Sequence, residues 1–267
     1  MGNAEWAFFE PFITGIRGRG GRPAGNHRQV LDGIFWIART GSQWRDLPEE
    51  FGKWSSVYRQ FRRWTVAGLW DLILDALNES KAMPDQVQMI DSTIIRAHHQ
   101  AAGAKGGPQR QGFGRSEGGF TTKIHLIANA HGLPMKAEIS GGEVSDYKGF
   151  DFLQADPLPA PKVFIADRGY DSNHIRDAIA AGGETPVIPA RANRKAPEPV
   201  DRITYALRNH VERCFNKMKC SRRLATRYDK TAASYLGFVQ IAAARLWIRS
   251  SSTGPRSAPS RSEGVRA

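Results

Sequence analysis

Cysteine is scarce in this sequence. Its 267 residues include only Cys214 and Cys220, too few for a disulfide scaffold. The two are six residues apart on one expected helix and project from different faces, so we expect reduced thiols. No Cys-x-x-Cys pair occurs, and the adjacent His98 and His99 would point to opposite faces of a strand. The sequence therefore argues against disulfide bonds and against a zinc site.

Long apolar runs are also missing. The most apolar stretch, residues 235–248, is interrupted by Gln240 and Arg245, so we expect no transmembrane helix. The first twelve residues include acidic side chains and have no basic segment ahead of an apolar run, unlike a secretory signal. We therefore expect a cytoplasmic protein that does not bind membranes.

Acidic residues are outnumbered by basic ones. The chain has 26 Asp and Glu against 38 Lys and Arg, which gives a net charge of +12. This balance favours polyanionic partners, above all nucleic acid. A hydrophobic content of 40% is sufficient for a core in a chain of this length. The composition thus predicts a globular protein, with one large domain or one domain and a small companion.

Residues 1–82 are expected to form a small helical domain. A glycine- and arginine-rich segment at 15–28 predicts a flexible basic arm. Apolar residues recur at helical spacing in the segments that follow it. These predict three helices, at 27–40, 55–68 and 69–80.

The middle of these three helices carries Arg59, Arg62 and Arg63. Short helices joined by glycine turns, with arginines on the middle one, are typical of a helix-turn-helix unit that reads DNA. A helical support whose arginines face water would show the same pattern. The sequence leaves both interpretations open.

Residues 83–250 change period and predict an α/β fold with a central mixed sheet. The expected elements are strands at 86–98, 120–130 and 133–140, a helix at 147–153, a strand at 162–167, a helix at 172–181, a strand at 184–188 and two longer helices. Residues 251–267 are rich in Ser, Pro, Gly and Arg, which predicts a disordered tail.

Two aspartates stand out in the expected sheet. Asp91 lies inside the first strand, where a carboxylate among apolar residues requires a compensating cation. Asp167 ends a later strand and projects at its carboxyl edge, a usual place for sites in α/β folds. Asp146 and Asp171 are nearby rivals, but both are explained more simply as helix caps.

A third acid, Glu212, stands among basic residues on an expected helix. Tyr205, Arg208, Glu212 and Lys219 are spaced at i, i+3, i+7 and i+14, which places them along one stripe of a continuous helix. Glu212 paired with Arg208 could simply stabilise the helix. Alternatively, the acid belongs to a site that binds an anion beside a metal.

Three carboxylates that converge from two strands and a helix suit the hard cations Mg²⁺ or Mn²⁺. Two such ions can hold the attacking and leaving oxygens of an in-line phosphoryl displacement. The basic residues beside them would then contact phosphates of a nucleic acid. Asp91, Asp167 and Glu212 are therefore candidate catalytic and metal-binding residues.

Three blocks carry a resemblance to a known family. MIDST around Asp91, ADRGYDS around Asp167, and the Tyr-x2-Arg-x3-Glu-x6-Lys pattern of residues 205–219 resemble the catalytic blocks of DDE transposases of insertion-sequence family five. Residues 30–64 resemble that family's N-terminal helical domain, and residues 222–249 resemble its closing helices. Nearly the whole chain is covered by the resemblance.

The resemblance implies a ribonuclease-H-like catalytic core, preceded by a small all-helical N-terminal domain. It further implies that the three acids bind two divalent ions, Mg²⁺ or Mn²⁺, for DNA hydrolysis at element ends and attack of the freed 3′-hydroxyl on target DNA. Implied partners are terminal inverted repeats, target DNA and further copies of the chain in a synaptic complex at the nucleoid. Only 44 residues separate Asp167 from Glu212, so we expect a compact core without an inserted β-domain.

Basic residues near these blocks are expected to contact DNA. The glycine-rich loop at 101–119 lacks Walker-type spacing and is interpreted as a phosphate-contacting loop, or else as an idle hairpin loop. In it, Glu117 departs from the arginine that is frequent in the family. The expected contacts are Tyr205, Arg208, Lys219, Arg115, Lys123, Arg168, Arg59, Arg62 and Arg63.

Two other functions are compatible with the same residues. A catalytically silent relative could bind DNA in a sequence-specific, repressor-like manner. A metal nuclease with the same fold would hydrolyse DNA without joining strands. Intact acids favour the transposase over the first alternative.

Overall fold

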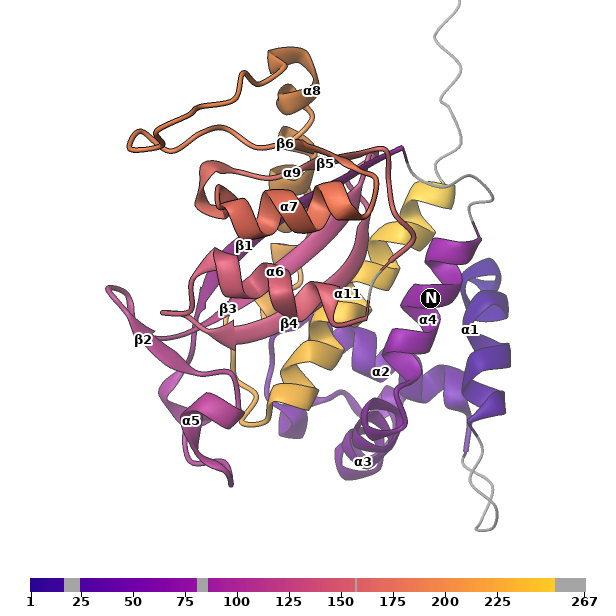
Figure 1. The fold of residues 1–267 in the computed structure, drawn as a ribbon. Helices are drawn as coiled ribbons and strands as arrows, with labels where there is room; N and C mark the ends of the chain where they lie inside the picture. The colour runs from indigo at the N-terminus through magenta and orange to yellow at the C-terminus, as the bar shows by residue number, and fades with distance from the viewer. Residues whose placement is uncertain (17–24, 81–85, 157, 253–267) are drawn as a thin grey trace, which may run out of the picture.

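The computed structural model describes residues 1–16, 25–80, 86–156 and 158–252. Most of the predicted basic arm and nearly all of the predicted tail fall outside the described residues. In the described part of the chain, no helix combines the length and apolarity needed to cross a membrane. The elements form a sheet covered on both faces by helices, with a helical group at one side (Figure 1).

Four helices form the N-terminal group: α1 (Asn3–Gly15), α2 (His27–Thr40), α3 (Trp54–Val66) and α4 (Leu69–Glu79), with short 3-10 turns η1 (Trp44–Asp46) and η2 (Glu49–Phe51). The predicted helix at 27–40 is confirmed, because Asn26 caps its first turn and Gly41 ends it in the left-handed conformation. Helices α3 and α4 also match their predictions to within a few residues. Helix α1, which contains Pro11, was not predicted.

The predicted mixed sheet is confirmed. Its strands are β1 (Val87–Arg96), β2 (Gly114–Ser116), β3 (Gly119–Asn129), β4 (Pro134–Gly141), β5 (Val163–Ile165) and β6 (Thr185–Val187). The order is β2-β3-β1-β5-β6, with β4 also paired to β3. Strands β1, β3 and β4 are antiparallel, whereas β5 and β6 run parallel to β1. Together with helices between the later strands, this order confirms the expected ribonuclease-H-like core.

The glycine-rich loop contains two elements that were not predicted. They are the short strand β2 and the one-turn helix α5 (Gly107–Arg110). Strand β2 pairs with the first residues of β3 and extends the sheet at that edge. The loop is therefore partly ordered structure.

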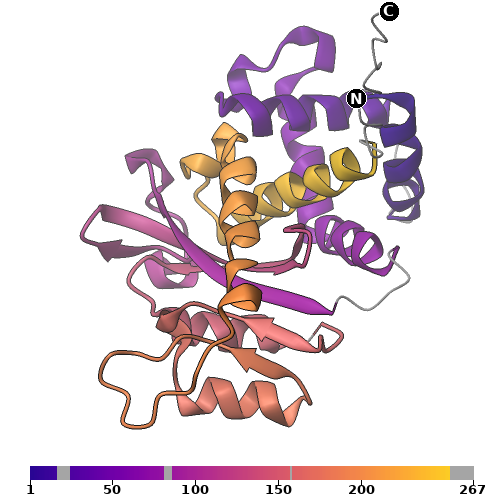
Figure 2. The same cartoon turned by 90° about the horizontal axis from the view of Figure 1, so that it is seen from above.

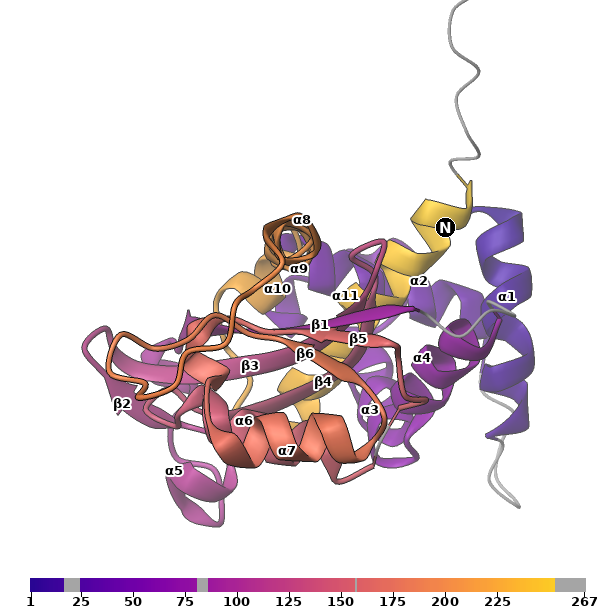
Figure 3. The ribbon, with the colours of Figure 1, turned by 45° about the horizontal axis from the view of Figure 1, so that its top comes forward.

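Helices cover the sheet on both faces. Figure 3 shows α6 (Asp146–Gln154) and α7 (Asn173–Ala181) on one side, with α9 (Asn209–Lys219), α10 (Arg222–Ala225) and α11 (Ala232–Ser252) on the other. Side chains alternate along the strands as pleating requires. Met89 and Leu126 join the core under α11, whereas Ile90 and Ile127 join the core under α6 and α7.

The prediction of a continuous helix over residues 205–219 is wrong. The segment forms α8 (Arg202–Ala206) and α9, and Arg208 stands just before the first residue of α9. Tight i→i+3 hydrogen bonds, such as Arg208 N to Tyr205 O at 3.0 Å, interrupt the helix at this point. The tight turn thus separates Tyr205 from α9, whereas Arg208 and Glu212 keep the i,i+4 spacing of a helix.

One hydrophobic core joins the N-terminal helices to the end of the chain. Phe61 on α3 stacks on Phe238 of α11 with ring centroids 4.6 Å apart. The same buried cluster continues to Trp247 and to the sheet through Met89. The N-terminal helices and α11 thus stabilise each other, while the predicted domain boundary near residue 82 stays a prediction.

Replacement of Phe61 should therefore destabilise the whole fold. Phe61 is fully buried, so Phe61→Ala should lower the free energy of unfolding by about 3–5 kcal/mol, the usual cost of such a truncation. Val66→Ala on the same helix is the matched control, because Val66 is 75% exposed. Urea unfolding measures both. A Phe61→Ala loss as small as that of Val66→Ala would contradict the shared core.

Candidate active site

Asp91 and Glu212 meet at one guanidinium group. Asp91 lies near the middle of β1, and its Oδ2 accepts a hydrogen bond from Arg208 Nη1 at 3.2 Å. Arg208 Nη2 donates to Glu212 Oε1, one turn along α9. The cation that the sequence required for Asp91 is thus Arg208, a residue 117 positions away.

Asp167 completes the group from the sheet's neighbouring strand. It stands two residues beyond β5, before the 3-10 turn η4 (Arg168–Tyr170). Its Oδ1 accepts a hydrogen bond from the Gly169 N–H at 2.7 Å, which fixes the carboxylate. A Cβ on Gly169 would lie 2.8 Å from that oxygen, so a larger residue there would push the Asp167 carboxylate aside. Asp167 lines one hollow together with Arg208, and its charge raises the pKa of both Asp91 and Arg208, so it lies near the other two acids.

Burial dominates the electrostatics of Asp91. Desolvation raises the pKa of its carboxyl from an ordinary 3.8 to about 6. The Ser92 N–H, 2.8 Å from Asp91 Oδ1, and the charge of Arg208 lower this pKa in part, while Asp167 and Glu212 raise it. Asp91 is thus the acid with the greatest need for positive charge.

A hollow of about 360 Å³ opens beside these acids. Asp167 and Arg168 line it from the sheet, and Tyr205 and Arg208 line it from the α8–α9 turn. The Arg208 guanidinium lies 5.9 Å from the centroid of the Tyr205 ring. The hollow therefore combines one acid with two arginines and a tyrosine, a lining that suits a phosphate group.

Asp146 is a fourth acid at this edge, and its interpretation as a helix cap is wrong. It is the first residue of α6, and its Oδ1 accepts hydrogen bonds from Ser92 Oγ at 2.6 Å and Lys123 Nζ at 3.1 Å. Its Oδ2 lies 3.2 Å from the position of a Cβ on Gly169. Sequence reasoning missed this role, since the partners lie 54 and 23 residues away.

Asp171 belongs to a different cluster. Its buried carboxylate pairs with Arg176 and Arg194, each at 2.9 Å, and accepts the Arg191 N–H at 2.7 Å. Ser172 caps α7 instead. Asp171 therefore holds the loop after β6 and is no rival for the active site.

Comparison with known proteins identifies the family. The sequence matches the family described as "Transposase DDE domain" over residues 82–247. Residues 1–74 match a second family, described as "Putative transposase of IS4/5 family". The chain belongs to the DDE transposases. This confirms the resemblance drawn from the three sequence blocks.

Individual relatives agree with this assignment. A putative transposase for insertion sequence element IS6501 from Brucella ovis is 35% identical over 131 residues, which are 49% of this chain and 100% of the relative. One for IS402 from Burkholderia cepacia is 31% identical over 130 residues, 45% of this chain and 59% of the relative. A piggyBac transposase synaptic complex with hairpin DNA aligns with 94% of this chain and 73% of that chain at 12% identity. Its TM-score of 0.48 is too low to support an argument.

The predicted DNA contacts of the transposase stay predictions, and their surroundings differ. Arg168 is exposed at the hollow, and Lys219 Nζ donates to Thr93 Oγ1 of β1 at 2.8 Å. Lys123 is buried and bound to Asp146, so a contact with DNA would require this ion pair to break. Arg115 is exposed on β2.

The three arginines of α3 differ from one another. Arg59 and Arg63 are exposed, whereas Arg62 Nη1 donates to Thr231 Oγ1 at 3.2 Å and Ser234 Oγ at 2.7 Å. Arg62 thus ties α3 to the start of α11. DNA contact by these arginines stays a prediction, and for Arg62 it would cost both bonds.

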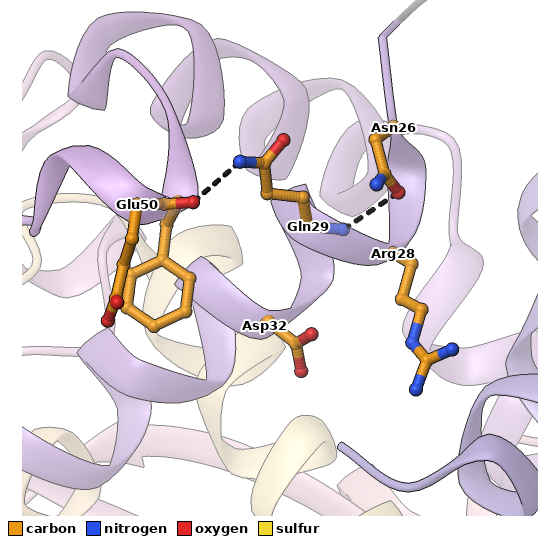
Figure 4. Close-up of a pocket in the computed structure, with 6 residues that line it drawn as sticks. Asn26, Arg28, Gln29, Asp32 and Glu50 are labelled. Carbon is orange, nitrogen blue, oxygen red and sulfur yellow. Dashed lines mark hydrogen bonds between the residues drawn. The ribbon is translucent and has the colours of Figure 1, made fainter.

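A second hollow, at the N-terminal helices, is not suited to DNA. Figure 4 shows Arg28, Asp32 and Glu50 around it. Asp32 forms an ion pair with the terminal amine of Met1 at 3.0 Å, and Arg28 donates to the Met1 carbonyl at 3.0 Å. The carboxylates of Asp32 and Glu50 would repel a phosphate, and the Arg28 guanidinium is already bound to the Met1 carbonyl.

The raised pKa of Asp91 predicts a pH-dependent stability. Because the folded pKa of about 6 lies above the ordinary 3.8, the stabilisation is full below pH 3.8 and is lost as the pH rises through 6. The ionised carboxyl then costs about 3 kcal/mol. In chelator, Asp91→Asn should gain that amount relative to wild type between pH 4 and 7, measured by urea unfolding. Asp177→Asn, at an exposed position of α7, is the control variant. If the difference in the free energy of unfolding between Asp91→Asn and wild type did not change with pH, the raised pKa of Asp91 would be disproved.

Proposed function

We propose that the transposase cleaves DNA at the ends of an insertion element and joins the freed 3′-hydroxyl to target DNA. The observation that carries this proposal is the convergence of Asp91 and Glu212 on one guanidinium, with Asp167 beside them. In such a reaction an oxygen nucleophile bonds to phosphorus as the phosphorus–O3′ bond breaks. Three carboxylates within reach of one phosphate hollow are the groups that this chemistry requires.

The donor set fits divalent cations, with one rearrangement. The described residues contain no ready cluster of three His, Cys, Asp or Glu side chains for a metal ion. Carboxylate oxygens are the ligands that Mg²⁺ or Mn²⁺ prefers, and those of Asp91 and Glu212 already share one positive partner, Arg208. Two ions held by the three acids would supply Lewis acidity at the scissile phosphate. Arg208 would have to turn away from Asp91 to admit them.

Basic residues around the hollow would hold the DNA backbone. Arg168 and Arg208 line the hollow together with Asp167 and can both donate to phosphate oxygens. Glu212 lies in the first turn of α9 and Lys219 in the last. Lys219 contacts Thr93 of β1 and so extends the positively charged surface along that strand. Arg208 can thus bind either Asp91 or a phosphate in the hollow. Its hydrogen bonds to a bound phosphate would replace the one that it loses with Asp91.

The wider assembly follows from the reaction. Two element ends have to be held together for insertion, so we propose a homo-oligomeric complex that binds terminal inverted repeats and target DNA at the nucleoid. The surplus of positive charge supports DNA as the partner.

Loss of one acid should abolish cleavage but preserve binding. Asp91→Asn should slow nicking of inverted-repeat DNA in Mg²⁺ by at least about a thousandfold, because the carboxylate acts on the reacting phosphate. Gel assays of nicked and joined products measure the rate, and anisotropy measures binding. Asp177→Asn should cleave like wild type. A wild-type protein that binds without nicking in Mn²⁺ would favour the repressor-like alternative, and nicking without joined products would favour a nuclease.

Removal of Arg168 should weaken DNA binding in a salt-dependent manner. Each phosphate contact contributes about 0.9 to the slope of log affinity against log salt, so Arg168→Ala should lower that slope by about one. Lys162→Ala is the control, because Lys162 is exposed at the opposite end of β5. Equal slopes for wild type and Arg168→Ala would show that Arg168 does not contact a phosphate.

A further inference from the structure

A cleft of about 330 Å³ lies between the N-terminal helices and the segment that joins α10 to α11. Its walls come from η1 and the first turns of α3, from the residues after β1, and from residues 223–234. The acids and the arginines of the hollow beside them are not part of its lining. The cleft is thus a separate site, and its ligand follows from its own side chains.

Aromatic rings dominate this cleft. Trp44 and Tyr58 contact each other with ring centroids 5.2 Å apart, and Tyr58 is 37% exposed. The Arg45 guanidinium lies over the Trp54 ring, 5.8 Å from the ring centroid. Tyr228 lies on the opposite wall. Rings held in place by their neighbours, but still open on one side, are surfaces on which a flat base can stack.

Polar groups in the cleft suit the edge of a base. The amide side chains of Gln43 and Gln100 are exposed in the same cleft and can both donate and accept.

Positive charge is available at the rim. Arg45 and Lys230 are exposed and form no ion pair with any residue that the structure describes. Arg223, by contrast, pairs with the buried Asp229 at 2.9 Å and is already neutralised. Two unpaired cations beside stacked rings match the phosphates on either side of a base.

Strand β1 connects the acids to this cleft. From Asp91 it runs past Thr93, which binds Lys219, to its end at Arg96. The chain continues to His98, whose N–H donates to the carbonyl of Arg227 at 2.9 Å. Seven residues of extended chain span about 23 Å. At 3.4 Å per nucleotide step, this corresponds to about seven steps of a DNA strand. Helix α9 lies across β1 between these two places (Figure 2).

We propose that this cleft binds an unpaired nucleobase of the DNA on which the transposase acts. The base stacks on Tyr58, its edge meets the amides of Gln43 and Gln100, and its phosphates contact Arg45 and Lys230. A paired base would hide its faces and its edge, so the site selects single-stranded DNA. The proposal rests on the proposed function for the identity of the nucleic acid, but it concerns binding and not cleavage.

Binding of matched single-stranded and duplex DNA tests the proposal. The full chain in chelator is titrated with a labelled oligothymidylate of about 16 nucleotides and with a blunt duplex of equal length. Tyr58→Ala should raise the Kd for the single strand by about 5- to 150-fold, the range for loss of one stacked base. The Kd for the blunt duplex should change less than about twofold, because that DNA offers no unpaired base.

Two control variants separate stacking from folding. Tyr58→Phe keeps the ring and should bind both DNAs like wild type. Phe152→Ala removes another exposed ring, on α6 outside the cleft, and should leave both Kd values unchanged. An equal loss on single strand and duplex in Tyr58→Ala, or no loss on either, overturns the proposal.

Failure of this proposal can be distinguished from failure of the proposed function. If wild type does not nick element ends but Tyr58→Ala loses only single-strand binding, the base site stands and the catalytic proposal falls. If wild type nicks DNA but Tyr58→Ala binds both DNAs like wild type, the base site alone is wrong.

Discussion

The ion pair between Arg208 and Asp91 is the contact on which the active site depends. It offsets the cost of burying a carboxylate in β1, and it fixes the α8–α9 turn against the sheet. The same guanidinium reaches Glu212 and lines the hollow beside Asp167. A single arginine therefore joins two acids that come from distant parts of the chain, beside a third.

The shared core gives this site a rigid frame. Because α3 packs on α11 and α11 packs on the sheet, the N-terminal helices cannot move independently of the acids without exposing Phe61 and Phe238. Arg62 adds two hydrogen bonds across the same joint. The aromatic cleft lies at this joint, so its distance from the acids is held by the core as well as by β1.

Several elements could be predicted because their signals are local. Helix α2 has apolar residues at helical spacing, Asn26 as its cap and Gly41 as its stop, and its bounds were correct. The interruption of the helix between α8 and α9 could not be predicted, since Leu207 and Arg208 are ordinary helix formers and the turn allows Arg208 to contact Asp91. Asp146 was taken for a cap because its partners Ser92 and Lys123 are remote in sequence.

By itself the sequence determined the family, the mixed sheet, the basic balance and the three acids, because these follow from motif spacing, residue period and composition. Only the tertiary structure decided which arginine compensates Asp91, that Asp146 joins the acids, and that Trp44, Tyr58 and Tyr228 line one cleft. Periodicity and capping act over a few neighbouring residues. Charge pairing and ring packing instead depend on which surfaces the folded chain brings into contact, and no local pattern encodes that choice.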